Sequence, residues 1–234
     1  MALEAKAVLE IGTSMVRVLV GEMRDDGTVM VTAVGEAESR GIRKGEIVNR
    51  DDAIACVRKA IKDAEENRRK NIHSVILITS GGQAEAKKTT GIHRVVDPNE
   101  NRLSELDEDD VKEVVEIARK VSLPENRIKL HTLQQYFQVD DTIDVTSPIG
   151  MACEELRVDM LTIHGKRSAL DNFRKIVDDA PIACADALFS GLCAAMAVVN
   201  EEQKQAEWRV QLQEQSDQQE VSLSIVCSSS SHGE

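Results

Sequence analysis

Three short apolar runs separated by tight turns open the sequence, and they restrict the fold more than any other feature. The runs cover about residues 5–11, 15–21 and 28–35, with Gly12-Thr13-Ser14 and Asp25-Asp26-Gly27 between them. Runs of this length bounded by glycine and aspartate predict β-strands, and connections this short favour antiparallel hairpins. We therefore expect a three-stranded meander at the edge of a sheet.

A helix and a buried strand are predicted after the meander. The helix covers about residues 51–70 and has Asn49 as its N-cap. Its predicted buried face consists of apolar residues at helical spacing: Ile54, Val57, Ile61 and Ala64. The run from Ser74 to Thr79 is short and rich in β-branched residues, which indicates a strand.

The middle third has a different pattern. We predict a polar strand over residues 85–96, a helix capped by Asp107, and two strands near 127–139 and 154–163. Beyond these, Ser168 is predicted to cap a helix, and a strand at 182–187 leads to an alanine-rich helix at 191–199. This succession indicates an α/β domain interrupted by a small α+β insert.

Composition excludes several functions. A net charge of −12 disfavours nucleic-acid binding, and 2% aromatic residues leave little material for stacking bases. The five cysteines and five histidines are scattered without metal-ligand spacing, so neither a disulfide framework nor a metal site is expected. Without a signal peptide or an apolar run of membrane-spanning length, the sequence predicts a cytoplasmic protein with no direct membrane anchor.

The turn from Glu10 to Met15 is the strongest candidate for chemistry. Gly12, Thr13 and Ser14 join two strands through a small hydroxylated loop, whose N–H groups can form a nest for phosphate oxygens. Many strand–glycine–strand turns are plain hairpins, so this loop by itself leaves that alternative open.

Four stretches of the sequence together are similar to a known family. They are residues 10–16 (EIGTSMV) followed by 20–22 (VGE), 39–49 (SRGIRKGEIVN), 147–151 (SPIGM) with 155–158 (ELRV), and 187–195 (ALFSGLCAA). In order and spacing they resemble FtsA, the cell-division family of the actin-like ATPase superfamily. The resemblance runs from about residue 5 to residue 205.

The resemblance implies an α/β fold with an actin-like, ribonuclease H-like subdomain 1A, interrupted by a small α+β subdomain 1C of the SHS2 type. Subdomain 1A, incomplete here, would comprise residues 1–84 and 164–205, and subdomain 1C residues 85–163. The Gln- and Ser-rich tail, residues 206–234, diverges from the family and is expected to be partly disordered.

The resemblance also identifies residues 10–15 as the first phosphate loop, with Glu10, Gly12, Thr13, Ser14 and Met15 as candidate nucleotide-binding residues. Full-length members bind ATP with magnesium. The family often carries aspartate where this chain has Glu10 and lysine where it has Met15, and no glycine-rich second loop follows Gln205. We therefore expect a degenerate site, with no cofactor bound and no catalytic residue.

The function implied by the resemblance is protein interaction in cell division. Family members link the FtsZ ring to the cytoplasmic face of the inner membrane and recruit division proteins. For this chain we expect contacts with other FtsA-like subunits and division proteins through 1C, whereas the FtsZ-binding domain of the family is missing from the sequence. The alternatives are an ATPase completed by a partner chain, a PilM-like pilus-assembly protein and a non-functional remnant.

Overall fold

The computed structural model describes residues 5–79, 84–95, 103–198, 208–213 and 220–225, and these residues contain two compact units. One unit is built mainly from the chain up to residue 84 and from residues 165–194, and the other mainly from residues 85–164. Within the described residues, no helix is both long and apolar enough to cross a bilayer.

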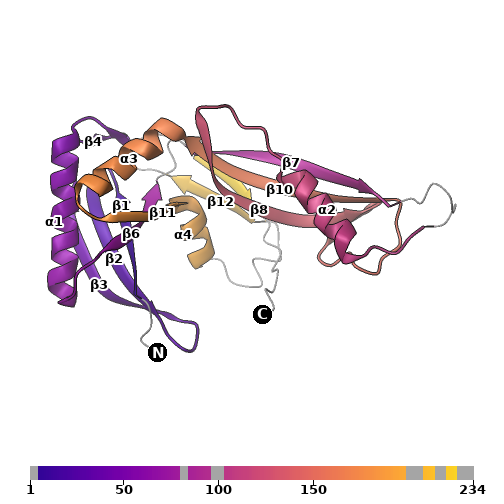
Figure 1. Cartoon of the computed structure of the whole chain (residues 1–234), viewed down its shortest axis with the longest axis horizontal. Coiled ribbons are helices and arrows are strands. Elements are labelled where there is room, and N and C mark those ends of the chain that lie inside the picture. The colour runs from indigo at the N-terminus through magenta and orange to yellow at the C-terminus, as the bar shows by residue number, and fades with distance from the viewer. Residues whose placement is uncertain (1–4, 80–83, 96–102, 199–207, 214–219, 226–234) are drawn as a thin grey trace. The chain divides into compact units, whose positions relative to one another are not determined.

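Five strands form the sheet of the first unit, in the spatial order β11-β6-β1-β2-β3 (Figure 1). They are β1 (Lys6–Ile11), β2 (Met15–Met23), β3 (Val29–Glu38), β6 (Ser74–Thr79) and β11 (Ala183–Phe189). β2 pairs antiparallel with β1 and β3, whereas β6 pairs parallel with β1 and β11. The predicted three-stranded meander is confirmed, and its last strand is the edge of the sheet.

Helix α1 (Arg50–Arg68) packs closely on this meander. Its predicted N-cap is confirmed, because the Asn49 side chain accepts hydrogen bonds from the N–H groups of Asp51 and Asp52. The four residues predicted for its buried face are all buried. A Cβ added at Gly35 of β3 would lie 2.1 Å from the Ala60 carbonyl oxygen, so the helix and the strand approach each other to backbone contact.

Helix α3 (Arg167–Asp179) contacts α1 and β11, and its predicted cap is wrong. The helix begins at Arg167, so Ser168 lies inside it, and Lys166 occupies the N-cap position without a side-chain cap. The reason is that strand β10 (Glu155–Lys166) runs directly into the helix and leaves no loop for a capping residue.

The second unit is a four-stranded sheet with one helix on it. Its strand order is β7-β10-β8-β9, with β7 (Ala84–Arg94), β8 (Arg127–Val139) and β9 (Thr142–Val145) added to β10. Helix α2 (Glu108–Arg119) begins with a capping box in which Asp107 and Asp110 bond to each other's backbone N–H, as Asp107 was predicted to cap it. The unit has its own apolar cluster, which includes Leu106, Val114 and Phe137.

The remaining elements are short. β4 (Ile42–Arg43) and β5 (Glu46–Ile47) form a small hairpin, and α4 (Ser190–Val198) follows β11. β12 (Trp208–Gln213) and β13 (Glu220–Ile225) form a two-stranded sheet inside the tail that we expected to be partly disordered. The cysteines in the described residues are free, and Cys227 lies outside them.

Candidate functional site

The turn between β1 and β2 is a closed hairpin of two loop residues. The Gly12 N–H donates to the Met15 carbonyl oxygen at 3.0 Å, and Ile11 pairs with Val16. A Cβ added at Gly12 would lie 2.9 Å from that same oxygen, which explains why glycine is needed there. The N–H of Gly12 is therefore used within the hairpin and does not point to a ligand.

The two loop residues remain open to an anion. Thr13 and Ser14 are both exposed, and in the described part of the chain neither of their N–H groups donates a hydrogen bond. Two adjacent free N–H groups beside two hydroxyls can bind one oxyanion. This donor set is smaller than the nest expected from the sequence, because Gly12 contributes no N–H to it.

The loop is fastened to the segment that follows β3. The Thr13 Oγ1 accepts a hydrogen bond from the Gly45 N–H at 3.1 Å, and the Ser14 carbonyl accepts one from the Ser39 N–H at 2.9 Å. Gly45 and Lys44 form the β4–β5 turn, with φ angles of 69° and 51°. The stretch 39–49 thus holds the phosphate-loop hairpin in place, a role that local sequence patterns do not reveal.

Glu10 lies in a row of charges across three strands. The Arg17 Nη1 is 3.8 Å from the Glu10 carboxylate, and the Arg17 Nε is 2.9 Å from the Glu36 carboxylate. Cross-strand pairing produces this row, since Glu10 is opposite Arg17 and Arg17 is opposite Glu36. Arg17 supplies a cation two residues from Met15, but two carboxylates already share it.

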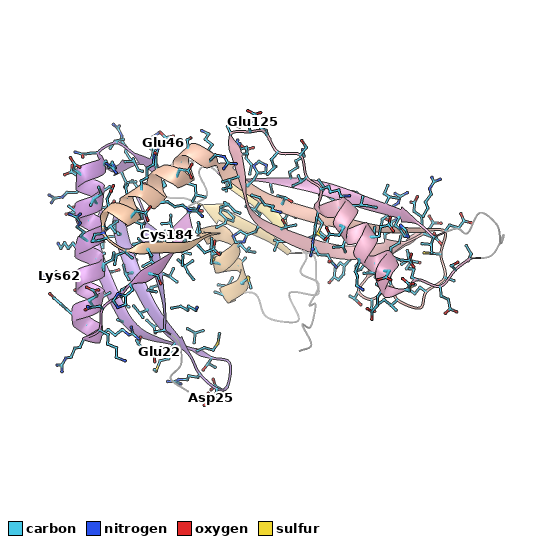
Figure 2. The ribbon with its side chains drawn as sticks, viewed as in Figure 1. Glu22, Asp25, Glu46, Lys62, Glu125 and Cys184 are labelled. Atoms are coloured by element: carbon cyan, nitrogen blue, oxygen red, sulfur yellow. The ribbon has the colours of Figure 1, made fainter. Side chains whose placement is uncertain are left out.

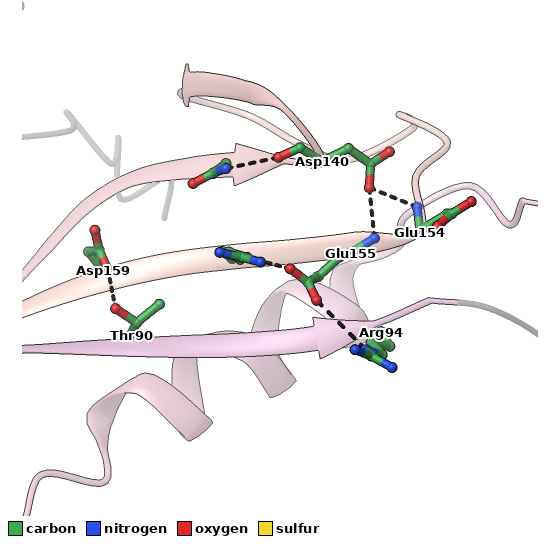
Figure 3. Close-up of polar contacts among 8 residues, drawn as sticks. Thr90, Arg94, Asp140, Glu154, Glu155 and Asp159 are labelled. Carbon is green, nitrogen blue, oxygen red and sulfur yellow. Dashed lines mark hydrogen bonds and ion pairs between the residues drawn. The ribbon is translucent and has the colours of Figure 1, made fainter.

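The second unit presents a polar sheet face on the side away from α2. On β7 the Thr89 hydroxyl bonds to the Ala118 carbonyl of α2 at 2.7 Å, so the alternate residues Lys88, Thr90 and Arg94 point the other way. Figure 3 shows Thr90 and Arg94 meeting the acidic residues of β10 there.

Two carboxylates of β10 organise this face. Asp159 accepts from the Lys88 ammonium at 2.6 Å and from the Thr90 hydroxyl at 2.5 Å. Glu155 lies 3.7 Å from Arg94 and also contacts Arg157. We name this cluster (Lys88, Thr90, Arg94, Glu155, Arg157 and Asp159) the polar face of the second unit.

Asp140 fixes the end of the same face. Its Oδ1 accepts the N–H groups of Glu154 and Glu155 at 3.0 and 2.9 Å (Figure 3). Its φ angle of 47° is in the left-handed region, which aspartate tolerates better than most residues. This contact joins the end of β8 to the start of β10.

Comparison with solved structures first defines the fold. A chain of the PilM–PilN type IV pilus biogenesis complex matches 82% of this chain and 49% of its own length with a TM-score of 0.53, at 11% identity. The chain therefore has an actin-like fold, in which the five-stranded unit is interrupted by residues 85–164.

Sequence comparison then identifies the relatives of the chain. Residues 85–164 match the family model described as the SHS2 domain inserted in FtsA. Cell division protein FtsA of Bacillus subtilis (strain 168) is 31% identical over 196 residues, covering 84% of this chain and 43% of the relative. FtsA of Neisseria meningitidis serogroup B is 28% identical over 198 residues, covering 85% of this chain and 46% of the relative. The chain is FtsA-like and homologous to these cell-division proteins, and it spans somewhat less than half of their length.

Proposed function

We propose that this chain acts in cell division as a protein-interaction module, through the polar face of its second unit. The observation that carries the proposal is that this face is organised by ion pairs and hydrogen bonds, although its residues lie on the side of the sheet away from the apolar core. Charged side chains held in fixed positions favour specific recognition of a partner. The homology to cell-division proteins makes a second FtsA-like subunit or another division protein the expected partner.

A charge reversal tests this role. Lys88→Glu adds a third carboxylate to the polar face, directly beside Asp159. It should weaken capture of FtsA-like and other division proteins at least about tenfold, since like charges at an interface cost several kcal/mol. Lys62→Glu is the matched control, because Lys62 is an exposed lysine of α1 paired to Glu66 at 3.6 Å. Equal binding by the two variants in a pull-down would contradict the proposal.

We further propose that the chain does not turn over ATP by itself. The hairpin offers two free N–H groups, and Glu10 is already paired with Arg17, so these residues do not fit a magnesium–polyphosphate group well. A calorimetric titration with ATP and magnesium should show no binding at micromolar concentration. Tight binding that is lost in a Thr13→Ala, Ser14→Ala double variant would overturn this view.

Nucleotide binding completed by a second chain is the other candidate. The exposed N–H groups of Thr13 and Ser14 favour this candidate, because contacts with Gly45 and Ser39 hold the loop in a position where both groups can donate to a phosphate oxygen. ATP binding that appears only after a partner protein is added would support this candidate.

A further inference from the structure

Side chains of α1 bond to the outer edge of β3 along one half of the strand. The Asn67 amide of α1 donates to the Val34 carbonyl at 2.9 Å, and the Glu36 N–H donates to the Asp63 carboxylate at 2.9 Å. These bonds occupy the Val34 carbonyl and the Glu36 N–H, two of the outward backbone groups that an added strand would need there. Edge strands in native proteins are commonly protected in this way.

The other half, Val29–Val31, is open. It lies beyond an irregularity in the pairing of β2 with β3, between Val20 and Gly21. Because the Arg24 N–H bonds to the Thr28 carbonyl at 2.7 Å, the antiparallel alternation turns the backbone groups of Val29 and Val31 outward. Within the described residues these groups face no further strand, since β3 ends the sheet.

The side chains at this open edge are apolar and exposed. Val29 is 64% exposed, Val31 57% and Met23, opposite Val29, 55%. They lie on the sheet face away from α1, since Val18 and Val20 of β2 are buried on the other side. An added strand would place every second side chain beside Val29 and Val31, so apolar residues at alternate positions suit it.

The charges at the two ends of the open edge indicate which kind of segment can bind there. Asp25 and Asp26 are at the hairpin tip, where Figure 2 labels Asp25, and Arg24 leaves that tip with one net negative charge. The Thr28 hydroxyl and N–H hold the pKa of Asp26 below its usual value, which keeps it ionised. At the other end lies the Asp63 carboxylate.

A second copy of the chain fits this edge poorly. Antiparallel pairing of two β3 edges across Val29–Val31 would place the acidic tip of each copy against Asp63 and Glu36 of the other. The chain as a whole carries a net charge of −12, which adds to the repulsion. A segment with basic residues at its ends has the complementary charge.

We propose that the Val29–Val31 edge of β3 binds an extended segment of another protein as an added strand, with apolar residues at alternate positions and lysine or arginine at both ends. The backbone groups of Val29 and Val31 give the ladder hydrogen bonds, and the acidic ends select the charge. This inference is independent of the polar face of the second unit and of any nucleotide.

Fluorescence anisotropy with the full chain tests the proposal. The probe is a labelled peptide in which valine and threonine alternate between paired lysines, and the comparison peptide has glutamates in place of the lysines. We expect the lysine peptide to bind at least about tenfold more tightly at low salt. Equal binding of the two peptides, or none of the lysine peptide, would overturn the proposal.

Two variants locate the binding to this edge. Val31→Pro removes an outward N–H that does not bond to β2, and it should weaken binding of the lysine peptide at least about fivefold. Val31→Thr keeps this N–H, and its affinity for the lysine peptide should stay within about twofold of wild type. Asp25→Lys, at an exposed position that tolerates charge, should reduce the preference for lysine over glutamate about threefold. Full binding by both Val31→Pro and Asp25→Lys would refute the site, as would a concentration-dependent dimer in sedimentation that Val31→Pro abolishes.

Discussion

Gly12 shows how a single residue decides what a loop can bind. The sequence predicted a phosphate loop at residues 10–15, and the structure places the five candidate residues on one hairpin. What the sequence could not reveal is that the Gly12 N–H closes the hairpin and that Gly45, 32 residues away, holds Thr13. Both depend on contacts made only after folding, so no local pattern encodes them. The assignment of these residues to nucleotide binding remains a prediction.

Gly35 should not tolerate even one added methyl group. In Gly35→Ala the new Cβ would lie 2.1 Å from the Ala60 carbonyl oxygen and 2.5 Å from the Ala64 nitrogen of α1. The helix must move away from β3, and we expect the free energy of unfolding to fall by about 2 kcal/mol in a urea titration. Glu38→Ala on the same strand serves as the control, because the Glu38 side chain is exposed and pairs with the nearby Arg40, and it should change the free energy of unfolding by less than about 0.5 kcal/mol.

His164 should make stability depend on pH. It is 6% exposed, and among the described residues its Nδ1 has no hydrogen-bond partner. Burial, followed by nearby Arg127, lowers its pKa below the ordinary value of 6.5. Glu85 and Lys87 of β7 also face it, and they act in opposite directions.

The unfolded chain binds a proton to this histidine more readily than the folded chain does. The stability that the neutral ring contributes is therefore complete above pH 6.5 and is lost as the pH falls toward the lower folded pKa. We expect His164→Leu to flatten the decline in thermal midpoint between pH 7 and pH 5. His73→Leu, at an exposed histidine, should keep the wild-type slope, and identical slopes in all three proteins would contradict this explanation.

At the scale of the element, the sequence pattern predicted a helix or strand correctly where that element is long or begins with a capping residue. The α1 and α2 starts follow from Asn49 and Asp107, whose side chains accept the first free N–H groups of each helix. The start of α3 could not be predicted from Ser168, because the preceding strand enters the helix directly. The strands β4, β5 and β9 have two to four residues, too few to show an alternation.

The capping box of α2 should lose strength in acid. Backbone N–H groups of Asp110 and Asp109 hold the pKa of Asp107 below its ordinary value of 3.8. The carboxylate form therefore stabilises the folded state above pH 3.8, and this contribution is lost as the pH falls through the lower folded pKa. Asp107→Ala should lower the thermal midpoint at pH 7, and its difference from wild type should shrink below pH 3.8.

Asp107→Asn separates the cap from its charge. Asparagine also accepts N–H groups at an N-cap but does not titrate in this range. Its thermal midpoint at pH 7 should lie close to that of wild type, and below pH 3.8 it should fall less steeply. If Asp107→Asn and Asp107→Ala were equally destabilised at pH 7, the side-chain cap would not be the cause.

At the scale of the whole molecule, the sequence pattern indicated an α/β domain with an α+β insert, and the structure has two units with separate apolar cores. Val18, Leu77 and Phe189 are buried in the first unit, whereas the second has its own cluster around Leu106, Val114 and Phe137. Chain order cannot reveal that the helices close on their sheets through glycines, Gly35 under α1 and Gly91 under α2. Each unit thus carries a position at which it can be weakened on its own.

Gly91→Ala should loosen the second unit and leave the first unchanged. A Cβ there would lie 2.2 Å from the Val114 carbonyl oxygen and 2.8 Å from the Ala118 nitrogen, so α2 must shift off β7. A cost of about 2 kcal/mol would accelerate hydrogen–deuterium exchange in α2 and β10 about thirtyfold wherever exchange occurs through opening of that unit. Exchange in α1 and β3 should remain at the wild-type rate, and Gly35→Ala should give the reverse pattern. Uniform acceleration across both units in either variant would mean that the two cores unfold together.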